Sequence, residues 1–170
     1  MSNPDFAIIC DGVRIKCHQI FLTNSSKVFA EIIEADQKDT NETDEKEVNK
    51  CAVDIPCSAS VGENMLRFIY TGELDPKALE NDAEVFLKLG DLYEMEALKD
   101  LAERKMMDNL STDNMVKFFL VGDQYKAEGL RMKAKDLIKC NIKMLKKKEG
   151  WKDQFGSNKD ILIEILEYCV

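Results

Sequence analysis

Only a few side chains of this sequence are of types that could exchange a proton with a substrate. His18 is the only histidine, and Asp5, Tyr70 and Tyr93 are the other candidates. A histidine that acts as a general base needs a nucleophile and an orienting group close by, and the sequence suggests no such set. Asp5 has no second carboxylate paired with it, and the tyrosines lie among apolar residues, as core tyrosines with a polar tip do. We therefore predict no catalytic residue and no enzyme activity.

Six cysteines provide the other reactive groups, at positions 10, 17, 51, 57, 140 and 169. They are spread thinly and follow no secretory signal, which favours reduced thiols over disulfides. A zinc site would need Cys-x₂-Cys pairs or a second histidine, and the sequence has neither. Cys10 and Cys17 fall in apolar segments, where a thiol packs as a small hydrophobic group. The glycines form no phosphate-binding loop, so we expect no metal ion and no cofactor.

Composition limits the kinds of partner. The chain has 170 residues, of which 45% are hydrophobic, and a formal net charge of −8. This is enough apolar material for a core, and the negative charge disfavours binding to a phosphate backbone. No apolar run approaches the roughly 20 residues that span a bilayer, and the first residues lack the basic and apolar regions of a signal peptide. We predict neither nucleic-acid nor membrane binding, and a location inside the cell, in the nucleus or cytoplasm or both.

The first part of the chain mixes strands and helices. Asp11-Gly12 tolerates positive φ and separates two apolar runs, so it predicts a hairpin of strands 6–10 and 13–17. A third short strand is expected at 51–55, closed by Pro56. Helices are predicted at 18–22 and 25–34, and Asn24 or Ser25 is the expected N-cap of the second. A further helix is expected to end at Gly72, because glycine suits a left-handed C-cap. The predicted class is an α/β fold, mostly α, with a small sheet flanked by helices.

The second part shows almost unbroken helical periodicity. Helices are predicted at 79–89, 94–107, 113–123, 128–145 and 160–168, and Ser111 or Thr112 is the expected N-cap of the third. Met95, Leu98, Ala102 and Met106 form a buried stripe, and Arg131, Lys133, Lys135, Asp136 and Lys139 form a solvated face. Trp151 is expected in a junction between helices.

An acidic segment with almost no apolar residue lies at 35–49. Long loops of this composition are usually either disordered or functional. We predict that the segment is mobile when no partner is bound, because ordering it costs entropy that little buried surface offsets. A fixed contact surface is the alternative.

The order of these features carries a family resemblance. The hairpin, His18, Ser25-Ser26-Lys27-Val28-Phe29 and Phe68-Ile69-Tyr70-Thr71-Gly72 follow one another in a way that resembles the BTB/POZ domain family, over residues 1–109. Residues 110–170 resemble the helical 3-box or BACK-like extension of the speckle-type POZ group of MATH-BTB adaptors. The segments that carry this second likeness are Leu110-Ser111-Thr112-Asp113-Asn114, Gly122-Asp123 and Glu149-Gly150-Trp151-Lys152.

The resemblance implies a function without bond chemistry. Members of this group are substrate adaptors of cullin-3 ubiquitin ligases: the BTB domain binds cullin-3, the extension adds a second contact surface, and a separate domain captures the substrate. Here Gln37-Lys38-Asp39 aligns with the cullin contact, in which relatives carry a hydrophobic anchor. We predict that cullin-3 binds, with reduced affinity, a composite surface made by Gln37, Lys38, Asp39, Tyr93, Met115, Phe118 and Phe119.

The same resemblance assigns structural roles. Asp5 fixes the first strand, His18 is the family's buried, hydrogen-bonded histidine, and Phe29, Tyr70 and Gly72 complete the motif. Relatives carry a MATH domain and a helix that is swapped in the homodimer, both before the first strand. Neither occurs before residue 5 here, so we expect a weakened homodimer and substrate recognition outside these residues. The alternative function is a self-association scaffold or transcriptional co-regulator that does not bind cullin-3.

Overall fold

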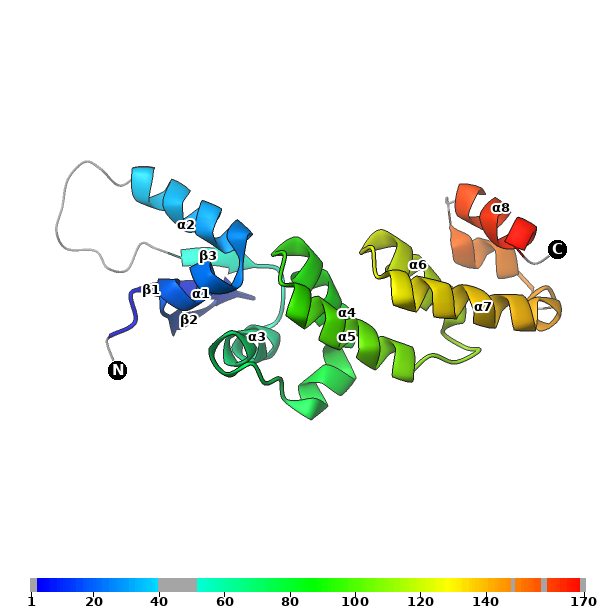
Figure 1. The fold of residues 1–170 in the computed structure, drawn as a ribbon, viewed down its shortest axis with the longest axis horizontal. Coiled ribbons are helices and arrows are strands. Elements are labelled where there is room, and N and C mark those ends of the chain that lie inside the picture. Colours follow the sequence, from blue (N-terminus) through cyan, green and yellow to red (C-terminus); the bar gives the residue numbers. More distant parts are fainter. Residues whose placement is uncertain (1–2, 40–51, 148, 157–158, 169–170) are drawn as a thin grey trace. The chain divides into compact units, whose positions relative to one another are not determined.

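The computed structural model describes residues 3–39, 52–147, 149–156 and 159–168 (Figure 1). The chain divides into two compact units, Met1–Lys99 and Asp100–Val170. The division falls within helix α5 (Glu96–Asp108), earlier in the chain than the domain boundary predicted at residue 109.

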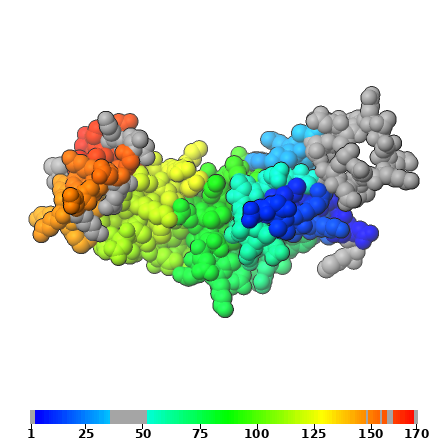
Figure 2. All heavy atoms as spheres, turned by 180° about the vertical axis from the view of Figure 1, so that it is seen from behind, coloured from blue at the N-terminus to red at the C-terminus, as the bar shows by residue number. Residues whose placement is uncertain are grey.

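A three-stranded sheet forms the centre of unit 1, with β1 (Phe6–Cys10) between β2 (Val13–Cys17) and β3 (Ala52–Ile55). β1 pairs antiparallel with β2 and parallel with β3. Asp11 and Gly12 turn the hairpin with φ of 51° and 75°, as the sequence predicted,. Helices flank this sheet, and both β1 and α1 (Gln19–Ser25) contact α3 (Ala59–Thr71) (Figures 1 and 2). The predicted fold class is therefore confirmed.

The helices of unit 1 begin and end at identifiable residues. Ser58 caps the first turn of α3 through Val61 N–H, and Gly72 ends that helix with φ of 74°, as predicted. Asp75 accepts hydrogen bonds from the first turn of α4 (Pro76–Leu92), which has a kink at Asp82. The helices of this unit are α1 (Gln19–Ser25), α2 (Lys27–Asp39), α3 (Ala59–Thr71), α4 (Pro76–Leu92) and the start of α5.

Helix α2 differs from its prediction at both ends. It begins after Ser26, whose hydroxyl accepts a hydrogen bond from Phe29 N–H, so neither Asn24 nor Ser25 is the cap. It continues through Asp39, because residues 35–39 contain helix-forming Ala, Gln and Lys and no Gly or Pro,. The prediction of a loop from residue 35 is therefore wrong for residues 35–39, which are helical. Residues 40–49 lie outside the described part of the chain, and the predicted mobility stays a prediction.

Unit 2 is helical. It contains α6 (Met115–Gln124), α7 (Glu128–Leu145), the 3₁₀ turn η1 (Trp151–Phe155) and α8 (Lys159–Tyr168). The N-cap position of α6 is Asn114, not Ser111 or Thr112, and the side chain of Asn114 instead accepts a hydrogen bond from Ser111 N–H. Trp151 is partly buried against a core that α6, α7, η1 and α8 build together, formed by Met115, Val116, Phe119, Ala134, Ile138, Leu145, Phe155 and Ile165.

Candidate interaction surfaces

One polar and one aromatic contact fix the start of α2 to the turn between α4 and α5. The hydroxyl of Ser26, which is buried, donates to the carbonyl oxygen of Tyr93 at 2.5 Å. The rings of Phe29 and Tyr93 stack with centroids 4.3 Å apart and planes 9° apart. Burial raises the pKa of Tyr93 to about 12, so its hydroxyl stays neutral. A cleft of about 370 Å³ lies beside this contact, lined by residues 23–27, Glu94 and Glu96.

A second set of contacts joins the hairpin to α1 and α3. Asp5 Oδ1 accepts from Gln19 N–H at 2.9 Å, and the Tyr70 hydroxyl lies 2.8 Å from both the backbone nitrogen and Nδ1 of His18. The hydrogen-bonded role predicted for His18 is therefore present. Its predicted burial is wrong, since His18 is only half-buried, and Tyr70 is 37% exposed and is not a core residue. The reason is that the hydrogen bonds between them are themselves at an exposed position, where solvent reaches both side chains.

Tyr70 packs against an exposed aromatic ring of α1, and Ile20 is the exposed apolar residue next to that ring in the sequence. The Tyr70 ring stacks on that of Phe21 with centroids 4.4 Å apart, and Phe21 and Ile20 are 41% and 56% exposed. We call Ile20, Phe21 and Tyr70 the α1–α3 patch. Apolar surface gathered in this way commonly marks an interaction site.

The helical corner between α4 and α5 recurs between α6 and α7. Gly90-Asp91-Leu92-Tyr93 and Gly122-Asp123-Gln124-Tyr125 stand 32 positions apart (122 − 90) and are followed by the same Glu-x-Leu-Lys/Arg pattern. Each corner is closed by an ion pair, Lys99 to Asp91 at 2.7 Å and Arg131 to Asp123 at 2.8 Å.

The two glycines of this repeat allow the helices of each corner to approach closely. A Cβ at Gly90 would lie 2.8 Å from the Lys99 nitrogen, and one at Gly122 would lie 2.8 Å from the Arg131 nitrogen. We did not predict this repeat from the sequence. The signal that reveals it is the similarity of the two segments at a spacing of 32 residues,.

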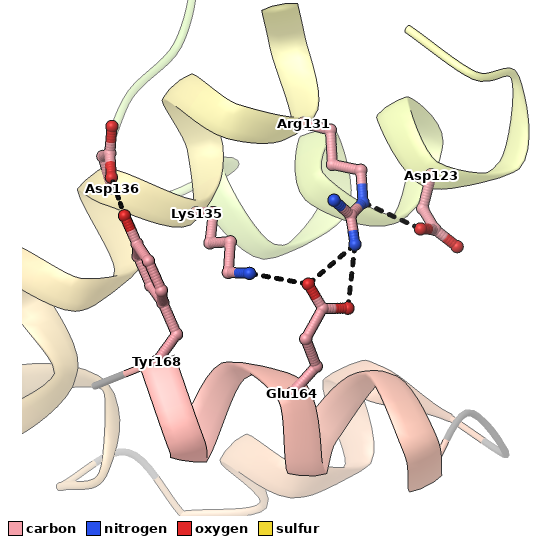
Figure 3. A network of polar contacts seen from close by, with 6 residues as sticks. All are labelled: Asp123, Arg131, Lys135, Asp136, Glu164 and Tyr168. Atoms are coloured by element: carbon pink, nitrogen blue, oxygen red, sulfur yellow. Dashed lines mark hydrogen bonds and ion pairs between the residues drawn. The ribbon is translucent and has the colours of Figure 1, made fainter. Parts of the chain in front are cut away.

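Unit 2 holds α8 against α7 through a polar network (Figure 3). Arg131 Nη2 donates to both carboxylate oxygens of Glu164, at 2.7 and 2.8 Å, and Lys135 Nζ donates to Oε1 at 2.6 Å. The hydrogen bond from Lys135 and the charge of Arg131 lower the pKa of Glu164. Tyr168 donates to Asp136 at 2.6 Å beside this group.

This network corrects the solvated face predicted for α7. Arg131 and Lys135 are half-buried, because Glu164 reaches them from a helix 29 to 33 residues away in sequence. Periodicity within α7 reveals the face but not the partner that covers it.

The seven residues predicted to bind cullin-3 do not have equivalent surroundings. Gln37, Lys38 and Asp39 form the last turn of α2, and the structure describes their backbone but not their side chains. Phe118 is partly buried against the core of unit 2. Binding stays a prediction for these four.

Three of the seven have a different role in the structure. Tyr93, Met115 and Phe119 are at most 4% exposed, because each packs into the core of its own unit. We therefore revise their expected role from direct contact to support of the surface. The structural motif residues Phe29 and Gly72 lie as predicted, one fully buried and one at a helix C-cap.

The described residues offer little for other chemistry. No group of three His, Cys, Asp or Glu side chains within them is arranged to hold a metal ion. Among the helices described, none is both long and apolar enough to cross a bilayer. Cys10 and Cys17 are buried among apolar strands, as predicted.

Comparison with known proteins agrees with the fold. The profile of the BTB/POZ domain family matches residues 2–110. With its small sheet flanked by helices, the chain belongs to the BTB/POZ family, whose domains are protein-interaction modules. It is 26% identical over 161 residues to the protein maternal effect lethal 26 of Caenorhabditis elegans. The match covers 95% of this chain, and the chain spans 39% of the length of that relative.

Proposed function

We propose that this chain is an adaptor that brings cullin-3 to a protein substrate, with the BTB unit as the main cullin-3 contact. The observation that carries the proposal is the anchoring of α2. Ser26 and Phe29 fix the first turn of α2 to the Tyr93 corner, and the helix continues through Asp39. The segment that the family resemblance assigns to cullin-3 is thus the last turn of a helix whose start is fixed in the core.

The helical extension supports the same proposal. Residues 110–170 carry the segments that resemble the speckle-type POZ extension, and Phe118 on α6 is the predicted contact residue there that remains partly accessible. The three buried residues act indirectly, by supporting α2 and α6.

Titration calorimetry of the full chain with the N-terminal region of cullin-3 tests the proposal. We expect saturable one-to-one binding that is weaker than that of relatives with an apolar anchor at position 37. A chain that is folded by circular dichroism and shows no heat of binding would contradict the proposal.

A self-association scaffold is the second candidate, and the α1–α3 patch favours it. Ile20 is 56% exposed on this patch, and burying such a side chain between two copies would favour a dimer. Sedimentation velocity of the wild type and the Ile20→Asp variant tests this. Met132→Asp is the matched control, since Met132 is 62% exposed on α7. A dimer weakened by Ile20→Asp alone, without cullin-3 binding, would support the scaffold.

A further inference from the structure

Two thiols meet where β1 ends and α3 begins. Cys57 Sγ donates a hydrogen bond to Cys10 Sγ at 3.7 Å, although the residues are 47 positions apart. Sheet pairing explains their proximity, since Cys10 lies opposite Ile55 in the parallel β1–β3 pair and Cys57 follows two residues later. The two sulfurs are therefore held together by backbone hydrogen bonds, not by flexible side chains alone.

Helix α3 fixes the position of the Cys10 sulfur. A Cβ at Gly62 would lie 2.4 Å from Cys10 Sγ, so the sulfur occupies the space that the missing side chain leaves. Cys10 is fully buried. With α3 on one side and Cys57 on another, its sulfur has little freedom to turn away.

Cys57 is the sulfur that a small molecule can reach. It is half-buried and lines a cleft of about 360 Å³, together with Asp11, Ile55, Pro56 and Ser58. A peroxide is small enough to enter such a space. The pair thus combines an accessible thiol with a buried one within reach of it, an arrangement that suits stepwise oxidation.

We propose that Cys10 and Cys57 are a redox modification site, which closes to an intramolecular disulfide in the presence of a peroxide. The deprotonated Cys57 sulfur attacks one peroxide oxygen, so that an S–O bond forms, the O–O bond breaks and hydroxide leaves. The Cys10 sulfur then attacks the Cys57 sulfur, the S–S bond forms, and the S–O bond breaks with loss of a second hydroxide. The two thiol protons convert both hydroxides to water, and the two electrons lost by the sulfurs reduce the peroxide.

The surroundings of the pair make this reaction slow at neutral pH. Burial raises the pKa of Cys57 to about 12, and burial also raises the pKa of Cys10. Among the described residues, the titratable groups placed near the two sulfurs include Asp11, Asp54 and Tyr93, which are acids and not cations. Since the thiolate is the nucleophile, the rate should rise with pH, and the site should respond to sustained oxidation and not to a brief pulse.

Closure would join two segments that are already neighbours in the fold. The bond would close a loop from residue 10 to residue 57, which includes residues 40–51. A bridge across a loop of this length restricts the unfolded chain more than the folded one. The oxidised form should therefore be the more stable.

The test is a peptide map of the full reduced chain after exposure to hydrogen peroxide, with the remaining free thiols then blocked by N-ethylmaleimide in denaturant, where the buried Cys10 is accessible. We expect a linked pair of peptides carrying Cys10 and Cys57, and a melting temperature raised by roughly 5–10 °C that dithiothreitol reverses. The Cys57→Ser variant should lose both effects. Cys140→Ser, which removes a solvent-exposed thiol, should keep them.

Two results would overturn the inference. One is a wild type, folded during prolonged oxidation, in which Cys10 and Cys57 are both still alkylated once the chain is unfolded in denaturant. The other is a bridge from either residue to a different cysteine, such as Cys51, which lies outside the described residues. Because the wild type itself gives the peptide map, the conclusion does not depend on how well the variants fold.

Discussion

The ring of Tyr93 lies nearly parallel to that of Phe29, 4.3 Å from it, and the Tyr93 carbonyl accepts the Ser26 hydroxyl. The two contacts join the start of α2 to a corner 67 residues away from Ser26. These two contacts fix the direction of α2, whose last turn holds Gln37.

Loss of the Ser26 hydroxyl should weaken the contact between α2 and the Tyr93 corner and lower the stability of the protein. In Ser26→Ala the Tyr93 carbonyl and the Phe29 N–H both lose a partner, and leaving buried polar groups unpaired costs about 1–3 kcal/mol,. Urea unfolding followed by circular dichroism measures the change. Ser60→Ala, at an exposed position of α3, is the control and should change stability by less than about 0.5 kcal/mol,. Equal effects of the two substitutions would contradict the prediction.

The repeated helical corner predicts the same loss of stability for two glycine substitutions. Gly90→Ala and Gly122→Ala each place a Cβ against the backbone of the following helix, which cannot move aside as a side chain can. We expect each to destabilise the protein by about 1–3 kcal/mol, although alanine is the better helix former. Gly129→Ala is the control, because the atoms nearest to its Cβ would belong to the side chains of Glu103 and Met107 and not to backbone. Thermal unfolding that ranks Gly129→Ala with the other two would show that the corners are not tightly packed.

The ion pairs of Glu164 should make stability depend on pH. Because its pKa is lower in the folded chain than the usual 4.5, its contribution is present above the unfolded pKa and is lost as pH falls through the folded pKa,. Glu164 is about one-third exposed, so solvent screening limits the effect to about 1 kcal/mol or less,. Below pH 4.5 the stability difference between the wild type and Glu164→Gln should therefore shrink.

Unfolding curves between pH 3 and 7 would check the dependence on Glu164. Glu167→Gln, an exposed position on the same helix, serves as the control and should follow the wild type. A constant difference between wild type and Glu164→Gln across this range would argue against the assigned role.

The cullin-3 proposal predicts a gain of affinity from one substitution. In Gln37→Met an apolar side chain returns to the anchor position, and full burial of such a group is worth roughly 1.5–3 kcal/mol before ordering costs. Affinity for cullin-3 measured by calorimetry should rise severalfold to tens of fold. Gln124→Met, at an exposed position of α6, is the matched control and should leave affinity unchanged.

Two other outcomes of the calorimetry would contradict the predicted gain in affinity, and they have different meanings. Tight binding by the wild type with no gain from Gln37→Met would place the contact elsewhere and show that the alignment of residues 37–39 is wrong. No binding by either form, with both folded, would favour the scaffold.

The features that the sequence determined by itself are local. Asp11-Gly12 and Gly72 adopt positive φ because their neighbours along the chain require a turn and a helix end there,. Met95, Leu98, Ala102 and Met106 are all buried, as their spacing on one helix predicted,. Each of these signals lies within a few residues, so periodicity and turn chemistry reveal it.

Only the tertiary structure decided which distant groups meet. Ser26 and Tyr93 are 67 positions apart, Cys10 and Cys57 are 47 apart, and Arg131 and Glu164 are 33 apart. No local pattern encodes these pairs, because each depends on how separate elements pack. For the same reason Arg131 and Lys135 looked solvated and Tyr70 looked buried in the sequence: a helix has two faces, and the elements that pack against it decide which side chains solvent reaches.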